Sequence, residues 1–63
     1  MSAPSNLKMA RLERGLTQWE VANATGIHQT YISLYENKLK DATYKHKKAL
    51  AKLYARRVKD LWQ

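Results

Sequence analysis

The chain has no cysteine and no phenylalanine, only two glycines and one proline, and five acidic residues among 63. The lack of cysteine excludes disulfide bonds and thiolate metal sites, and the two histidines lie too far apart to suggest a metal site. We therefore expect no metal and no cofactor. A chain this short is near the lower limit for an independent core, so it should form one domain, residues 1–63, stabilised by packing alone.

Long hydrophobic runs are absent as well. No segment approaches the roughly 20 apolar residues that span a bilayer, and the polar start MSAPSN lacks the apolar stretch of a signal peptide. We expect a cytoplasmic protein with no membrane partner. The chain also lacks a paired-carboxylate set, a nucleophile with a nearby base and a glycine-rich phosphate loop, which predicts no enzymatic activity and no small-molecule substrate.

Positive charge is what the sequence has in excess. The formal net charge is +7 and the sequence pI is about 10.0. Nine of the twelve lysines and arginines follow residue 37, where only Asp41 and Asp60 oppose them. An excess of this size indicates a polyanionic partner, either nucleic acid or an anionic membrane surface.

Capping signals predict a first short helix near the start of the chain. Residues 1–5 read as a flexible polar arm. Ser5 or Asn6 can cap a helix over residues 7–14, which Gly15 should end.

Two further short helices follow. Thr17 and Glu20 have the spacing of a capping box, which predicts a second helix over residues 18–25 that ends at Gly26. A third helix is predicted over residues 28–37, with a polar first turn that projects outward.

The last third of the chain should also be helical. Asp41 or Thr43 can cap a segment from residue 44 to 62 that is either continuous or broken near Arg56. No polar and apolar alternation typical of strands occurs, so the expected fold is all-α with four or five short helices. The apolar stripe of the last segment comprises Tyr44, Leu50, Leu53 or Tyr54, Val58 and Leu61.

The second and third helices, joined by a glycine turn, form a helix-turn-helix over residues 18–37. Ala22 is small enough for the next helix to cross closely, and Gly26 suits a turn that needs positive φ. The run LKMARLERGLTQWEVANATGIHQTYISLYEN, residues 7–37, resembles the Cro and repressor type of helix-turn-helix domain, the XRE family. The resemblance implies a compact lambda-repressor-like DNA-binding domain.

The chain departs from the family pattern after the third helix. Lys38 stands where the family usually has glycine, so Asn37 or Lys38 must take the left-handed conformation, and asparagine tolerates it better. Ala42 replaces a proline that often precedes the fourth helix, and no glycine at Ala55 separates the last two helices.

In the family, the first turn of the third helix contacts base edges in the major groove. The resemblance therefore assigns base contacts to His28, Gln29, Thr30 and Ser33, with Leu34 beside them. Glutamine can pair with both N6 and N7 of adenine, so Gln29 is the main candidate for reading sequence. The alternative is that these polar residues only cap and solvate the helix start.

Phosphate contacts are expected on both sides of this turn. Free N–H groups and the positive dipole end suit a phosphate at the start of the second helix, although the capping box alone could explain its residues. Lysines at the start of the last helix oppose the macrodipole, so phosphate binding explains them better than helix stability, unless they only solubilise the chain. The expected phosphate contacts are Thr17, Gln18, Asn37, Lys38, Lys40, Lys45 and Lys48.

Three further features have both a functional and a structural interpretation. The resemblance implies that Arg11 pairs with Glu36, and the alternative is two separate solvated charges. Trp19 should be partly exposed, either along the DNA backbone or over the edge of the core. Tyr54, Leu61 and Trp62 could form a dimer patch or simply close the core.

These observations favour a sequence-specific duplex DNA-binding regulator of transcription, of the phage or mobile-element repressor and Cro type. It should act as a homodimer on a two-fold operator, with recognition helices roughly 34 Å apart. Two alternatives stay open. One is an antitoxin with the same fold, and the other is a protein- or membrane-binding module that uses its basic amphipathic C-terminal helix.

Overall fold

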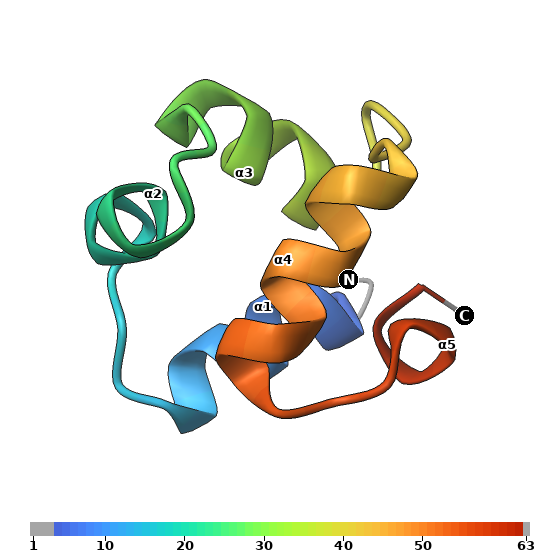
Figure 1. Ribbon diagram of the computed structural model, residues 1–63, viewed down its shortest axis with the longest axis horizontal. Helices are drawn as coiled ribbons and strands as arrows, with labels where there is room; N and C mark the ends of the chain where they lie inside the picture. Colours follow the sequence, from blue (N-terminus) through green and yellow to red (C-terminus); the bar gives the residue numbers. More distant parts are fainter. Residues whose placement is uncertain (1–3, 63) are drawn as a thin grey trace.

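Five short helices make up the computed structural model, which describes residues 4–62 (Figure 1). No strand occurs in that part of the chain, so the predicted all-α fold is confirmed. Residues 1–3 of the expected flexible arm lie outside the described residues. The helices are α1 (Asn6–Glu13), α2 (Gln18–Thr25), α3 (Gln29–Glu36), α4 (Tyr44–Tyr54) and α5 (Val58–Leu61).

Hydroxyl caps begin three of the helices. The Ser5 side chain accepts from the Lys8 N–H at the start of α1, and Thr43 accepts from the His46 N–H at the start of α4. At α2 the predicted capping box is complete, because Thr17 accepts from the Glu20 N–H at 3.1 Å and Glu20 accepts from the Thr17 N–H at 2.9 Å. Local sequence therefore determines where these helices begin.

Left-handed residues set the directions of the turns. Gly26 ends α2 with φ 75°, as predicted. After α3 the positive φ falls on Lys38, at 58°, and not on Asn37, whose side chain instead donates to the Ser33 carbonyl. Ala55, at φ 54°, breaks the last segment into α4 and α5 without a glycine. A non-glycine residue in this region costs on the order of 1–2 kcal/mol, which the surrounding packing must offset.

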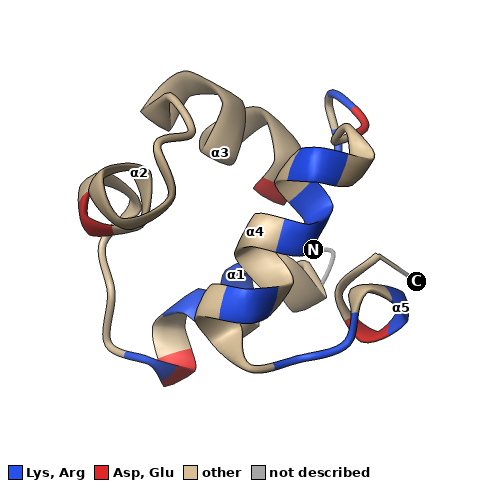
Figure 2. Ribbon diagram, viewed as in Figure 1, with Lys and Arg blue, Asp and Glu red and all other residues tan. Residues whose placement is uncertain are grey.

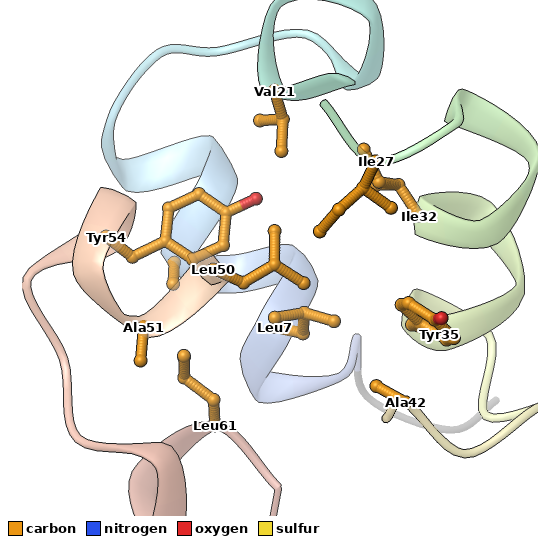
Figure 3. Close-up of a cluster of buried hydrophobic side chains, with 11 residues drawn as sticks. Leu7, Val21, Ile27, Ile32, Tyr35, Ala42, Leu50, Ala51, Tyr54 and Leu61 are labelled. Carbon is orange, nitrogen blue, oxygen red and sulfur yellow. The ribbon is translucent and has the colours of Figure 1, made fainter. Parts of the chain in front are cut away.

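Apolar side chains from all five helices meet in one core (Figure 3). Its largest fully buried members are Tyr54, Leu7, Ile32, Leu50 and Val21. The prediction that Tyr44 joins this face was wrong, since Tyr44 is 70% exposed. Tyr44 precedes Leu50 by six residues, which places it about 120° away around the helix axis. The inner face of α4 consists instead of Leu50, Ala51 and Tyr54.

The C-terminal helices close this core and do not form an exposed patch. Tyr54 and Leu61 are buried, and Trp62 is half-buried with the Lys47 ammonium 5.6 Å from its ring centre. In Figure 1, α2 and α3 lie at one end of the molecule and α5 at the other, and α5 packs against α1 and α4. Because the apolar face of α4 is used in the core, it is not free to lie on a membrane. No helix among the described residues is long and apolar enough to cross one.

Replacement of Tyr54 by phenylalanine should leave stability at neutral pH unchanged or slightly higher. Among residues 4–62, the Tyr54 hydroxyl is the one buried side-chain group without a hydrogen bond. It points into the core (Figure 3), where the charges of Arg11 and Glu36 also act on it. A buried hydroxyl without a partner costs about 1–3 kcal/mol, so its removal costs nothing. Thermal denaturation of both proteins checks this, and a clear loss of stability in the variant would reveal a hydrogen bond to the hydroxyl.

The same pair of proteins should differ in alkali. Burial raises the pKa of Tyr54 to about 12, whereas an unfolded tyrosine ionises near pH 10. Between these values the unfolded chain has lost a proton that the folded chain retains, so the free energy of unfolding falls as pH rises from about 10 to 12. Tyr54→Phe should show a smaller fall over that range, and parallel curves would contradict the burial of the phenol.

Candidate nucleic-acid interface

The start of α3 is fixed by the turn that precedes it. Gly26 reverses the chain after α2, and the buried Ile27 anchors the turn in the core. His28 then caps α3, so the helix begins at Gln29, one residue later than predicted, and ends one residue earlier, at Glu36. The first turn of α3 consequently has a defined position relative to α2.

His28 is exposed, but its ring has a local role. Its Nδ1 accepts from the Thr30 N–H at 3.3 Å, and its ring lies edge-on to Tyr31 with centroids 6.5 Å apart. Since Nδ1 must be unprotonated to accept, Nε2 is the nitrogen that can contact another molecule. His28 therefore lies at the position predicted to contact a base, and it also caps α3, which was the alternative interpretation.

The other candidate base contacts share one side of α3. Thr30 is exposed, and Gln29, Ser33 and Leu34 are half-buried. At 3.6 residues per turn these four positions fall within about 140° of the helix circumference. The opposite side carries the buried Ile32. The structure therefore brings the candidate base contacts together on the side that faces away from the core.

Gln29 is held by a hydrogen bond that the sequence did not reveal. Its Nε2 donates to Oε1 of Gln18, the first residue of α2, at 2.6 Å. The Nε2 of Gln18 in turn donates to Oε1 of Glu36 at 3.1 Å. The two side chains at the helix starts are thus joined to each other and to a charged group at the end of α3.

The pairing of Arg11 with Glu36 is present and buried. Arg11 Nε donates to Oε2 at 2.7 Å and Nη2 donates to Oε1 at 3.1 Å, while Nη1 donates to the Leu16 carbonyl at 2.9 Å. Arg11 is 8% exposed and Glu36 is 4% exposed. Hydrogen bonding to Glu36 raises the pKa of Arg11 against the opposing effect of burial. The pair ties α1 to the end of α3 and fixes the position of the helix-turn-helix.

The start of α2 has groups available for an anion. The Thr17 and Glu20 side chains are both engaged in the capping box, which leaves the N–H groups of Gln18 and Trp19 without intrahelical partners. Trp19 is 67% exposed beside them, as the sequence predicted. The positive end of the helix dipole lies at the same place, which favours a negatively charged ligand.

Lysines and arginines lie beside the helix-turn-helix and not within α2 or α3. Figure 2 shows lysines and arginines along α4 and in the loop before it, whereas α2 and α3 carry none. Lys47 pairs with Asp41 at 3.4 Å. The nitrogen of Lys48 lies 5.5 Å from the Tyr44 ring centre. Of the residues expected to contact phosphate, those near the end of α3 and the start of α4 are all exposed: Asn37, Lys38, Lys40, Lys45 and Lys48.

His46, which the sequence showed only as part of a lysine cluster, has a structural partner. Its Nδ1 lies 2.7 Å from the Tyr35 hydroxyl, and Tyr35 stacks on Tyr31 with centroids 6.2 Å apart. These contacts join α3 to the start of α4 and fix the lysines there relative to α3. No set of three or more potential metal ligands clusters within residues 4–62.

Comparison with known proteins agrees with this geometry. Neither the curated proteins nor the solved structures contain a significant match to the chain. A family model described as Helix-turn-helix matches residues 7–61, which is most of the sequence. The match includes the core, the Arg11–Glu36 pair and both helices of the motif. The chain therefore belongs to the Cro and repressor type of helix-turn-helix family, the XRE family, whose members bind DNA and are not enzymes.

Proposed function

We propose that this domain is a sequence-specific regulator of transcription that places α3 in the major groove of duplex DNA. The observation that carries the proposal is the bonded pair Gln18 and Gln29, which fixes two polar side chains at the starts of adjacent helices. Neutral residues at this position suit base edges, while the cations lie to the side, where phosphates would be.

Gln29 is the residue proposed to read sequence. One N–H of its amide is engaged by Gln18, which leaves the carbonyl oxygen and the second N–H for a base. Adenine presents the matching donor, N6, and acceptor, N7, in the major groove. Thr30, Ser33 and Leu34 share this side of α3 and are proposed to contact neighbouring base pairs, with His28 beside them.

Phosphate contacts are proposed on both sides of the first turn of α3. The start of α2 supplies Thr17, the N–H groups of Gln18 and Trp19, and a positive dipole end. The loop before α4 and the first turns of α4 supply exposed lysine ammonium groups, each of which acts as a point charge. Two such anchors, one on each side of α3, would fix its depth and orientation in the groove. The second anchor comprises Asn37, Lys38, Lys40, Lys45 and Lys48.

We further propose that the domain acts as a cytoplasmic homodimer on a two-fold operator, as a repressor or Cro-like regulator of phage or mobile-element type. One short recognition helix of eight residues reads only a few base pairs. Because a genome offers on the order of 10⁶ or more competing sites, a single half-site gives too little selectivity. Two copies whose recognition helices lie roughly 34 Å apart would double the sequence read.

Replacement of Gln29 by alanine should cost about 1–3 kcal/mol of binding energy on the preferred site and almost nothing on random DNA. The reason is that base contacts discriminate between sequences, whereas phosphate contacts do not. The lost hydrogen bond to Gln18 is worth about 1 kcal/mol, so the variant should stay folded with a melting temperature lower by about 4–8 °C. Titration of labelled duplexes at one salt concentration measures both affinities.

Asn23→Ala provides the matched control, because Asn23 is an exposed polar residue of α2 that lies about 140° around the helix from Gln18. It should leave both affinities unchanged. Equal weakening of specific and random binding by Gln29→Ala would show that Gln29 contacts phosphate, and base reading would then belong to Thr30 and Ser33.

A further inference from the structure

One edge of α3 carries aromatic side chains that the proposed contacts leave out. Tyr31 lies about 200° around the helix from Gln29, so the two residues are on opposite edges of the side that faces away from the core. The Tyr31 ring stacks on Tyr35, and its centre lies 6.2 Å from that of the His46 ring at the start of α4. Tyr31 is 42% exposed and His46 is half-buried. These rings therefore join α3 to α4 and also reach the surface.

The imidazole of His46 is oriented by a buried partner. Its Nδ1 lies 2.7 Å from the Tyr35 hydroxyl. Burial raises the pKa of Tyr35, so this hydroxyl keeps its proton throughout the range in which histidine titrates. Nε2 of His46 has no hydrogen-bond partner among residues 4–62, and it is not a buried atom. Nε2 is consequently the nitrogen that can bind another molecule.

His46 can gain a proton without losing its partner. A hydroxyl both donates and accepts, so Tyr35 can donate to a neutral imidazole and accept from a charged one. His28 differs, because its Nδ1 accepts from the Thr30 N–H and can do so only without a proton. Of the two histidines in the chain, His46 is therefore the one suited to change its charge.

The titratable and charged groups around His46 come from α3, the loop after it and α4. They are Tyr31 and Tyr35 on α3, Asp41 in the loop, and Lys45 and Lys47 on α4. The one carboxylate in this set, Asp41, already pairs with Lys47 at 3.4 Å. The anion that would best stabilise a charged His46 is therefore one from outside the domain.

The width of the major groove brings this edge of α3 to the DNA backbone. An α-helix with its side chains is about 10–12 Å across and the groove is about 12 Å wide, so the two edges of an inserted helix approach the two phosphate strands. Gln29 and the start of α2 lie at one edge. Tyr31 lies at the other, with His46 beside it and the exposed Lys45 next along α4.

We propose that Tyr31 and His46 form a binding site for a DNA backbone phosphate, and that His46 takes up a proton from the buffer when DNA occupies this site. The inference rests on the function proposed above. The Tyr31 hydroxyl and His46 Nε2–H donate to the phosphate, and a charged imidazole gives the stronger, charge-assisted hydrogen bond. The phosphate in turn favours the charged imidazole. Affinity for DNA therefore rises as pH falls through the range of histidine titration, and this gain is lost above that range.

The pH dependence of DNA affinity at constant salt tests the proposal through His46→Gln. Glutamine places an N–H donor near the position of Nε2 but does not titrate. Because one opposite charge changes the proton affinity of a group by about tenfold or more, wild-type affinity should rise about fivefold more between pH 8 and pH 6 than that of the variant. Equal pH dependence in the two proteins would overturn the inference.

Proton NMR of the wild-type protein provides a measurement that needs no variant. The chain has two imidazoles, and that of His46 is identified by its proximity to the Tyr35 ring. Its resonances should titrate at a higher pH in the complex with duplex DNA than in the free protein. Identical titration in the two states would show that no phosphate acts on His46.

Tyr31→Phe tests the other half of the site. Loss of one hydrogen bond to a phosphate should weaken binding about fivefold to tenfold on preferred and random duplexes alike, with the pH dependence retained. A loss confined to the preferred duplex would assign Tyr31 to a base and contradict the phosphate site.

The matched control is His28→Asn, which removes the other histidine and leaves a residue that caps helices well. The readout is the change in affinity between pH 8 and pH 6, which should stay close to the wild-type value. Loss of the pH dependence in this variant, with its retention in His46→Gln, would overturn this inference alone. A wild type that binds no duplex at either pH would overturn the proposed function and this inference with it.

Discussion

Replacement of Glu36 by alanine is expected to lower the free energy of unfolding by about 3–5 kcal/mol, the range found when one partner of a buried ion pair is removed. The substitution leaves the Arg11 guanidinium in the core with one carbonyl partner, that of Leu16. It also removes the acceptor for Gln18. Urea denaturation followed by circular dichroism measures the change. Because a domain of this size has only a few kcal/mol in total, partial unfolding in the absence of urea is the expected appearance.

The control for this experiment is Glu13→Ala, which removes the partner of Arg56 in an exposed ion pair. Surface pairs contribute roughly 0–1 kcal/mol, so this variant should denature close to the wild type. If Glu36→Ala denatured at the same urea concentration as Glu13→Ala, the link between α1 and the end of α3 would have no role in holding the helix-turn-helix.

Affinity for duplex DNA should fall about 500-fold between 50 and 200 mM monovalent salt. We expect about five phosphates to be neutralised per protomer, by the four exposed lysines near α3 and the positive end of α2. A slope near −0.9 per contact gives a change in log K of about −4.5 for each tenfold rise in salt. Fluorescence anisotropy of a labelled duplex over a series of salt concentrations measures the slope.

Two lysines of α4 account for part of that slope. Lys45→Ala with Lys48→Ala should make it shallower by up to about two, without changing the preferred sequence. Lys8→Ala with Lys59→Ala, on α1 and α5, removes the same charge from exposed residues of helices outside the proposed site and should change the slope far less. Affinity that does not respond to salt would exclude phosphate contacts as the basis of binding.

Local signals were sufficient to predict α1, α2 and α3 to within one residue at each end, whereas they left open whether residues 44–62 form one helix or two. A hydroxyl at Thr17 with a carboxylate three residues later is the signature of a capping box. Gly26 adopts the positive φ of the turn at little steric cost because it has no Cβ. The Arg11–Glu36 pair could be predicted as well, although only through the family resemblance, because the two residues are 25 positions apart.

The position of the positive φ after α3 and the exposure of Tyr44 were predicted less well. Asparagine tolerates a positive φ better than lysine, yet Lys38 adopts it because Lys38 follows the cap residue of α3, where its N–H bonds to the Tyr35 carbonyl and the next N–H bonds to the Leu34 carbonyl. Tyr44 was assigned to the core from its apolar character, but its position around α4 relative to Leu50 turns it outward. The first outcome depends on how the chain leaves α3, whereas the second follows from the helical repeat along α4.

The hydrogen bond between Gln18 and Gln29 was the main feature of the candidate site that the sequence did not predict. Gln18 was expected to contact a phosphate and Gln29 a base, each as a separate residue. Their contact depends on the crossing of α2 and α3, which brings together side chains 11 positions apart. It changes the interpretation of Gln29 from a freely projecting side chain to a half-buried one with a fixed orientation.

Selection of bound duplexes from a random pool tests sequence-specific DNA binding by this domain most directly. The full chain is mixed with duplexes that carry a random central segment, and the bound fraction is amplified and sequenced over several rounds. We expect one enriched motif containing an adenine whose enrichment is lost with Gln29→Ala, and, for a dimer, two inverted copies about 10 base pairs apart. A bound pool as random in sequence as the starting pool would contradict sequence recognition by α3.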